Sequence, residues 1–380
     1  ITIAPAPVLG GLYFWSADLR GLYRLVLGSR QAVPYIAPRT SENPDACSGC
    51  HSVSRDGGTV AFTRGQAEEA EDIYDNAAFN GSLTVAGVLE PNKPFISPVV
   101  NAPSDSAMTA LSSNGSRVIS AFDYILRLRD VDSNEQIDTF ERTDGKSAFF
   151  PEWSPNDDAL VVTLSSKPDS EIAVRSGSIA TIEMSEDGFG SVKEIVPEEP
   201  GTAHYYPTWS PDGEWIAFVS GPGGPADVDK SYYQPESRLR LVRRQGGTVY
   251  EMKTATGRGD QTATWPKFAP FQQCPAGMET CSPEERLFFL TFSSRRDYGL
   301  RLTSADGASA VSQLWLSAID LRRLGDDAAD PSLPPLWLPY QSTETPNHLG
   351  FWTEALRCNE RLPCDRYDVC VEGECRVLVR

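Results

Sequence analysis

The sequence is poor in the residues that most often carry metal or nucleophile chemistry. It has 3 His and 4 Met among 380 residues, and it contains no Gly-x-Ser-x-Gly motif, the turn that presents the nucleophile of α/β-hydrolases. A Ser-His-Asp triad therefore has few ways to form. No apolar run approaches the roughly 18 residues that a transmembrane helix requires. We expect no transmembrane segment.

Positive charge is scarce as well. Lys and Arg total 34 against 52 Asp and Glu, which gives a net charge of −18. This balance argues against a nucleic-acid backbone or an anionic membrane surface as a partner. The acidic insertion at residues 68–75 lacks the spaced ligands of a calcium-binding loop, so we expect an exposed loop there.

A repeated unit stands out in what the sequence does contain. An apolar strand ends in Ser or Pro, a tight turn follows, and a second apolar strand begins. Asp-Gly and Asn-Gly supply the positive φ angles of such a hairpin turn. The copies recur roughly every 40 to 60 residues, which is the spacing of propeller blades. The five copies are residues 206–218 (YPTWSPDGEWIAF), 150–162 (FPEWSPNDDALVV), 110–119, 265–270 with an insertion before 287–290, and 50–62.

The ends of the chain can supply a sixth blade. Residues 12–16 and 22–27 have the pattern of second and third strands, and residues 348–353 have that of the missing first strand. We predict an all-β, six-bladed β-propeller over residues 1–356, closed by its C-terminal strand, and a short cysteine-rich tail over residues 357–380. Closure removes exposed sheet edges. A β-sandwich of repeated hairpins is the alternative.

The repeated units resemble the Trp-Ser-Pro-Asp-Gly repeats of TolB-like propellers. The strongest matches are residues 209–213 and 153–157, and the resemblance covers most of residues 10–355. It implies a six-bladed periplasmic domain. It says little about chemistry, because propellers are reused for many functions.

The cysteines bear on localisation. Four of the 8 lie in the tail, and their spacing suggests two disulfides. Of the three possible pairings we favour Cys358 with Cys370 and Cys364 with Cys375. A further disulfide is predicted between Cys274 and Cys281, which flank a turn. An even, clustered set of cysteines indicates an oxidising compartment, periplasmic or extracellular.

The remaining two cysteines belong to residues 47–51 (CSGCH), at the start of the copy at 50–62. This pattern matches the attachment motif of haem c: Cys47 and Cys50 would form thioether bonds to the haem, and His51 would bind its iron. Residues three apart on a strand face opposite sides, so the segment must bend. Residues 43–45 (NPD) favour a turn. We predict that the motif lies in the loop entering the inner strand of blade 2, at the mouth of the channel.

The second axial ligand of such a haem has several candidates. His348 belongs to the neighbouring blade 1 and is the nearer candidate, and His204 lies across the channel in blade 5. Met108 is the rival of His348, because it begins the inner strand of blade 3 on the other side. A vacant position is also open, and it would favour ligand binding or peroxide chemistry over pure electron transfer.

Two functions follow from these observations. The first is an exported, cytochrome-like propeller that carries one covalent haem c and exchanges electrons with a redox partner protein. The second is a TolB-like interaction propeller without a cofactor, in which Cys47 and Cys50 form a disulfide and the channel mouth binds an envelope protein or a peptide. A zinc site lacks a fourth ligand, and a thioredoxin-like role needs a helix start. Whether the protein is an enzyme is left open.

Overall fold

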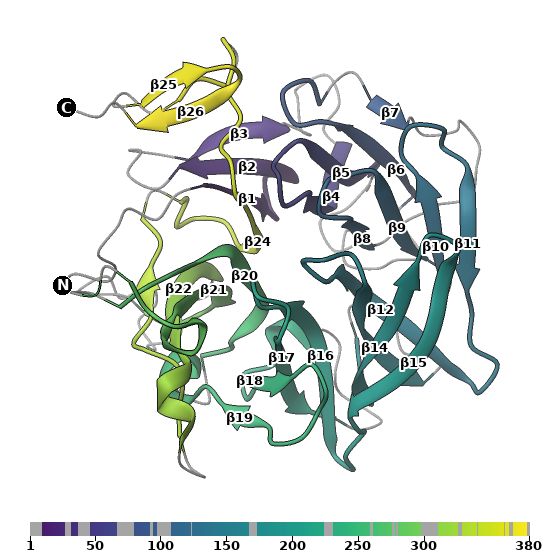
Figure 1. Ribbon diagram of the computed structural model, residues 1–380, viewed down its shortest axis with the longest axis vertical. Helices are drawn as coiled ribbons and strands as arrows, with labels where there is room; N and C mark the ends of the chain where they lie inside the picture. Colours follow the sequence, from purple (N-terminus) through teal and green to yellow (C-terminus); the bar gives the residue numbers. More distant parts are fainter. Residues whose placement is uncertain are drawn as a thin grey trace.

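The computed structural model contains a closed ring of six four-stranded antiparallel sheets (Figure 1). It describes residues 10–26, 32–36, 46–66, 80–91, 94–96, 108–122, 124–166, 173–223, 231–258, 261–275, 278, 280–297, 311–325, 329–339, 341–360, 362–364 and 368–377. The all-β, six-bladed architecture predicted from the repeats is confirmed.

Each blade is numbered from its inner strand outward. Blade 1 consists of β24 (Asn347–Thr353), β1 (Gly11–Ser16), β2 (Gly21–Val26) and β3 (Val33–Ile36). Blade 2 consists of β4 (Ala46–Val53), β5 (Thr59–Gln66), β6 (Asn80–Gly87) and β7 (Pro94–Ile96). Blade 3 consists of β8 (Met108–Leu111), β9 (Arg117–Phe122), β10 (Ile125–Asp130) and β11 (Gln136–Phe140). Blade 4 consists of β12 (Lys146–Trp153), β13 (Ala159–Ser166), β14 (Gly177–Ser185) and β15 (Gly188–Val196). Blade 5 consists of β16 (Thr202–Trp209), β17 (Trp215–Pro222), β18 (Arg238–Arg243) and β19 (Tyr250–Glu251). Blade 6 consists of β20 (Thr264–Gln273), β21 (Leu287–Ser294), β22 (Gln313–Asp320) and β23 (Leu336–Trp337).

The ring closes as predicted, by the last strand of the propeller. β24 pairs antiparallel with β1, from Gly11 opposite Thr353 to Ser16 opposite Asn347. The inner strands β24, β4, β8, β12, β16 and β20 each contact the next one around the ring (Figure 1). The six inner strands therefore surround one central channel.

The polar residues of the repeat fix its turn. In blade 2, the Ser54 hydroxyl donates to Asp56 at 2.6 Å and accepts from the Thr59 amide at 2.9 Å. Gly57 sits at φ 71°, and a Cβ there would lie 2.6 Å from the Ala355 carbonyl oxygen. A side chain at Gly57 would therefore push against the segment that follows the closing strand.

The repeat Trp holds neighbouring blades together. In blade 5, the Trp209 amide donates to a Glu152 carboxylate oxygen at 2.9 Å, and its indole Nε1 donates to the Glu152 carbonyl at 3.1 Å. Its ring is fully buried, which contributes about 1.5–3 kcal/mol for a large apolar side chain.

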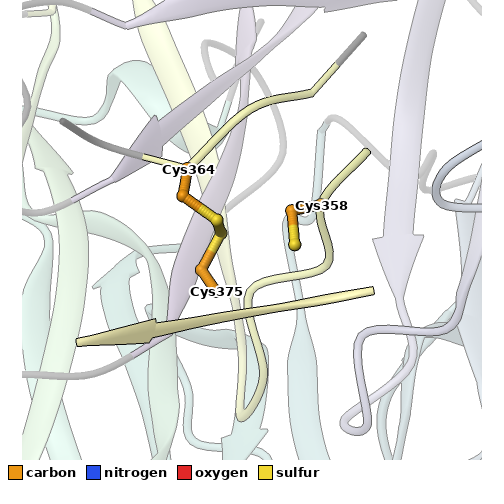
Figure 2. A group of neighbouring side chains, drawn as sticks. All are labelled: Cys358, Cys364 and Cys375. Atoms are coloured by element: carbon orange, nitrogen blue, oxygen red, sulfur yellow. A yellow bond between two sulfur atoms is a disulfide. The ribbon is translucent and has the colours of Figure 1, made fainter. Parts of the chain in front are cut away.

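The tail forms the hairpin of β25 (Asp368–Val371) and β26 (Glu374–Val377), beside blade 1 in Figure 1. All three predicted disulfides are present, Cys358–Cys370, Cys364–Cys375 and Cys274–Cys281. The sulfurs of Cys358, Cys364 and Cys375 lie within 4.8 Å of one another (Figure 2). Because all three are bonded in disulfides, none is available here as a thiolate ligand for a metal.

Helical segments are short in the described part of the chain. They are η2 (Ser231–Tyr233), α1 (Lys253–Thr256), η3 (Pro283–Glu285) and η4 (Leu321–Gly325). No described helix has the length and apolar character needed to cross a membrane.

Candidate functional site in the central channel

Cys50 and His51 lie within β4, so the predicted placement of the motif in a loop before this strand was wrong. The strand itself contains a bulge: the pairing of β4 with β5 shifts between Gly49 and Ser52, and Cys50 has φ 47°. A left-handed backbone costs roughly 1–2 kcal/mol at a residue with a Cβ. The turn predicted at residues 43–45 lies outside the described residues. The side chain of Cys47 lies outside the described residues.

The bend at Cys50 recurs in other inner strands. Four other non-glycine residues have a positive φ angle at the equivalent position of their inner strands. They are Phe150 (52°), Tyr206 (55°), Trp265 (51°) and Leu349 (55°). Bulges re-aim the neighbouring side chains. In blades 4, 5 and 6 the next residue is a proline, Pro151, Pro207 and Pro266, and in blade 2 it is His51. The haem-type motif therefore replaces a recurrent proline by an imidazole.

His51 lines a pocket on the propeller axis. Residues of all six inner strands enclose it, with an empty volume of about 390 Å³, and Met108 lines the same pocket. Its walls are largely aromatic and apolar: the rings of Tyr206 and Trp265 stack at 3.8 Å, and Phe150 packs edge-on against Tyr206 at 4.5 Å. The channel is thus largely filled by aromatic side chains at this level, and His51 lies among apolar walls.

The imidazole of His51 is held in one tautomer. It is 2% exposed, its Nε2 donates to the Tyr13 carbonyl at 3.2 Å, and its ring lies edge-on to Phe351 at 5.2 Å. Its Nδ1 is buried and has no hydrogen-bond partner among the described residues. Burial lowers the pKa of His51 to about 4. The ring is therefore neutral at pH 7, and Nδ1 carries an unused lone pair.

The two other histidines lie outside this pocket. His348 is 1% exposed and packs against the rings of Trp15 at 6.4 Å and Tyr232 at 5.8 Å, and burial lowers its pKa to about 3. His204 pairs through Nδ1 with the Ser220 hydroxyl at 2.8 Å, inside blade 5. Of the three candidate second ligands, only Met108 shares the pocket of His51.

A second pocket adjoins the first along the axis, toward the end of the channel where the inner hairpins turn. Its empty volume is about 560 Å³, and it shares Thr109, Pro151, Lys267 and Phe351 with the first pocket. Its charged residues come from separate blades, and the sequence pattern gave no signal for them. They are Arg55, Glu152 and Lys267.

Glu152 and Lys267 form an ion pair inside this second pocket. The Glu152 carboxylate also accepts from the Thr208 hydroxyl at 2.7 Å, and the Lys267 ammonium lies 4.5 Å from the centre of the Phe351 ring. This pair links blade 4 to blade 6, past the inner strand of blade 5 that lies between them.

The donor groups around His51 match those that a haem iron uses. They are a neutral buried imidazole with one unpartnered nitrogen and a Met in the same pocket. One contact opposes ligation through Nε2, the hydrogen bond to the Tyr13 carbonyl. That bond would have to be released.

No protein-family model and no curated protein sequence matches the chain. Solved structures do match in fold. TolB from Acinetobacter baumannii superposes with a TM-score of 0.51 at 12% identity, over 90% of this chain and 66% of the TolB chain. A chain of the nidogen/laminin complex gives a TM-score of 0.51 at 11% identity, over 90% of this chain and 97% of its own.

At these identities the similarity concerns the fold alone. The chain is a TolB-like six-bladed propeller in architecture, and it spans slightly less than two thirds of the TolB chain it matches. The function has to be argued from the channel.

Proposed function

We propose that this protein is an exported, c-type cytochrome-like propeller that carries one covalent haem on Cys47 and Cys50, with His51 as an axial ligand. The observation that carries the proposal is the position of His51. It stands where three other blades have proline and brings a neutral, buried imidazole into an apolar axial pocket.

Attachment needs no co-reactant beyond the haem itself. Each thiol of Cys47 and Cys50 adds across one vinyl group: a sulfur–carbon bond forms, and the thiol hydrogen passes to the other vinyl carbon. When bound, a haem supplies one-electron redox chemistry. The proposal is supported by the bulge at Cys50, which breaks the regular alternation of the strand between the two cysteines.

Met108 is the second axial ligand that this proposal favours. It lines the same pocket as His51, whereas His348 and His204 do not. A thioether ligand raises the reduction potential of a haem relative to a second histidine. The expected role is electron transfer with a redox partner protein in the periplasm or outside the cell. The three disulfides are consistent with such an oxidising compartment.

Expression in a host with haem c maturation tests the proposal. The wild type should show sharp α and β bands on reduction and should retain them under denaturing conditions. Cys50→Ser should lower the covalent haem content, and His51→Gln should keep the attachment but change the spectrum. Met108→Leu should change the axial ligation, whereas His204→Gln serves as the matched control without effect. Wild-type protein without visible bands would refute the proposal.

A second candidate is the interaction propeller with a Cys47–Cys50 disulfide. The observation in its favour is the bond from His51 Nε2 to the Tyr13 carbonyl, which gives the imidazole a structural role between blades 2 and 1. In that case the partner is an envelope protein or a peptide at the channel mouth. The same expression experiment separates the two candidates, because a disulfide leaves the protein colourless.

A further inference from the structure

The second pocket contains a cation that makes no direct ion pair with the described residues. The Arg55 side chain lines this pocket and forms no hydrogen bond or ion pair with any residue that the structure describes. Lys267, the other cation, is already paired with Glu152. A guanidinium in a concave site presents a planar fork of donors that matches a carboxylate.

Of the four acidic groups whose charge acts on Arg55, Glu152, Asp157 and Asp212 are bonded to other residues, and no direct bond joins the Glu354 carboxylate to the Arg55 side chain. Asp157 accepts from the amide and hydroxyl of Ser113 at 2.8 and 3.0 Å, and Asp212 accepts from the Glu214 amide at 3.1 Å. Their field, with those of Glu152 and Glu354, helps to keep Arg55 protonated against the lowering of its pKa by burial. The same field disfavours ligands of high negative charge. The fitting ligand therefore carries a single negative charge.

The other residues of the pocket indicate the chemistry of the uncharged part of the ligand. Trp153, Phe268, Phe351 and Trp352 contribute aromatic wall to this pocket. Ser52 and Ser113 add hydroxyls on the side of Arg55. The pocket thus combines one unpaired cation with an aromatic floor.

We propose that the turn end of the channel is a binding site for a small monocarboxylate with an aromatic or aliphatic body, whose carboxylate pairs with Arg55. The site uses none of the residues assigned to haem attachment. It therefore stands or falls separately from the proposed function.

Calorimetric titration of the purified full chain with benzoate tests this site. Wild type should bind one benzoate in a saturable manner, and Arg55→Gln should weaken the binding at least tenfold. Arg55→Lys keeps the charge but loses the fork, and it should weaken the binding less than Arg55→Gln. Arg244→Gln is the matched control: this arginine pairs with Asp158 on the same side of the propeller and does not line the pocket. The affinity of the Arg244→Gln variant for benzoate should stay within twofold of that of wild type.

Two further probes check the chemistry of the ligand. Benzylamine, which reverses the charge, and inorganic phosphate, which raises it and lacks the apolar body, should each bind at least tenfold more weakly than benzoate. The proposal is overturned if wild type does not bind benzoate, if either probe binds as tightly, or if both folded Arg55 variants bind benzoate like wild type. A denaturation curve for each variant establishes that it is folded. If Arg55→Gln does not fold, the benzoate affinities of wild type and Arg55→Lys are compared instead, and equal affinities overturn the proposal.

Discussion

His348 gives the propeller a specific sensitivity to acid. Its side chain is 1% exposed, neither ring nitrogen has a hydrogen-bond partner among the described residues, and burial lowers its pKa from 6.5 to about 3. The folded state therefore keeps the ring neutral where the unfolded state protonates it. The stability that depends on this group is fully present above pH 6.5 and is lost as the pH falls from 6.5 toward 3.

The magnitude follows from the two pKa values. Each pH unit within this window costs about 1.4 kcal/mol, so the loss between pH 8 and pH 5 is about 2 kcal/mol from this residue alone. His348→Phe removes the titrating group. Because the imidazole makes no hydrogen bond, the replacement loses none, and we expect a change of no more than about 1–2 kcal/mol at pH 8 from repacking.

Urea denaturation of both proteins at pH 8, 6 and 5 measures the difference. Other groups, including His51 and His204, titrate in both proteins and cancel in the comparison. The free energy of unfolding of His348→Phe should fall by about 2 kcal/mol less than that of wild type between pH 8 and pH 5. Equal losses in the two proteins would refute the assignment of His348 as a buried neutral base.

Three further outcomes are expected. Gly57→Ala should lose about 3 kcal/mol of stability, because the added Cβ meets a carbonyl oxygen at 2.6 Å at positive φ, whereas Gly145→Ala, also at positive φ but with nothing within 4 Å, should lose about 1 kcal/mol; similar losses in denaturation curves would contradict this contact. Glu152→Gln should lose about 3 kcal/mol by stranding Lys267 without its partner, and adding Lys267→Met should restore most of it; no recovery in the double variant would count against a coupled pair. Reduction of the tail disulfides should expose residues 357–380 to proteolysis and leave the propeller resistant; cleavage inside the blades at the same rate would contradict a separate tail.

The fold was readable from the sequence because its signals are local. Each Ser-x-Asp-Gly turn is specified by hydrogen bonds within a few residues, as Ser54 and Asp56 show, and the spacing of such turns gives the blades. The closing strand, predicted at residues 348–353 and observed at Asn347–Thr353, was found by a different argument, from the absence of a first strand in blade 1. Cysteine spacing alone indicated the three disulfides.

The site was only partly predictable, because its geometry depends on contacts between distant blades. Strand periodicity indicated that the segment of Cys47 and Cys50 must turn, but it did not predict the bulge inside β4, which several inner strands share. The second pocket gave no signal, since Arg55, Glu152 and Lys267 stand in unrelated sequence contexts and meet only when the ring closes. Likewise, Met108 could not be separated from His348 until the axial pocket was located.

The central claim concerns the chemical state of two cysteines. Mass analysis of the proteolytic fragment that contains residues 47–51, taken from protein made with haem c maturation, tests it most directly. The account predicts a fragment heavier by one haem, with both thioether bonds assigned to Cys47 and Cys50. A fragment lighter by two hydrogens than its reduced form and free of haem would contradict the account and establish the disulfide.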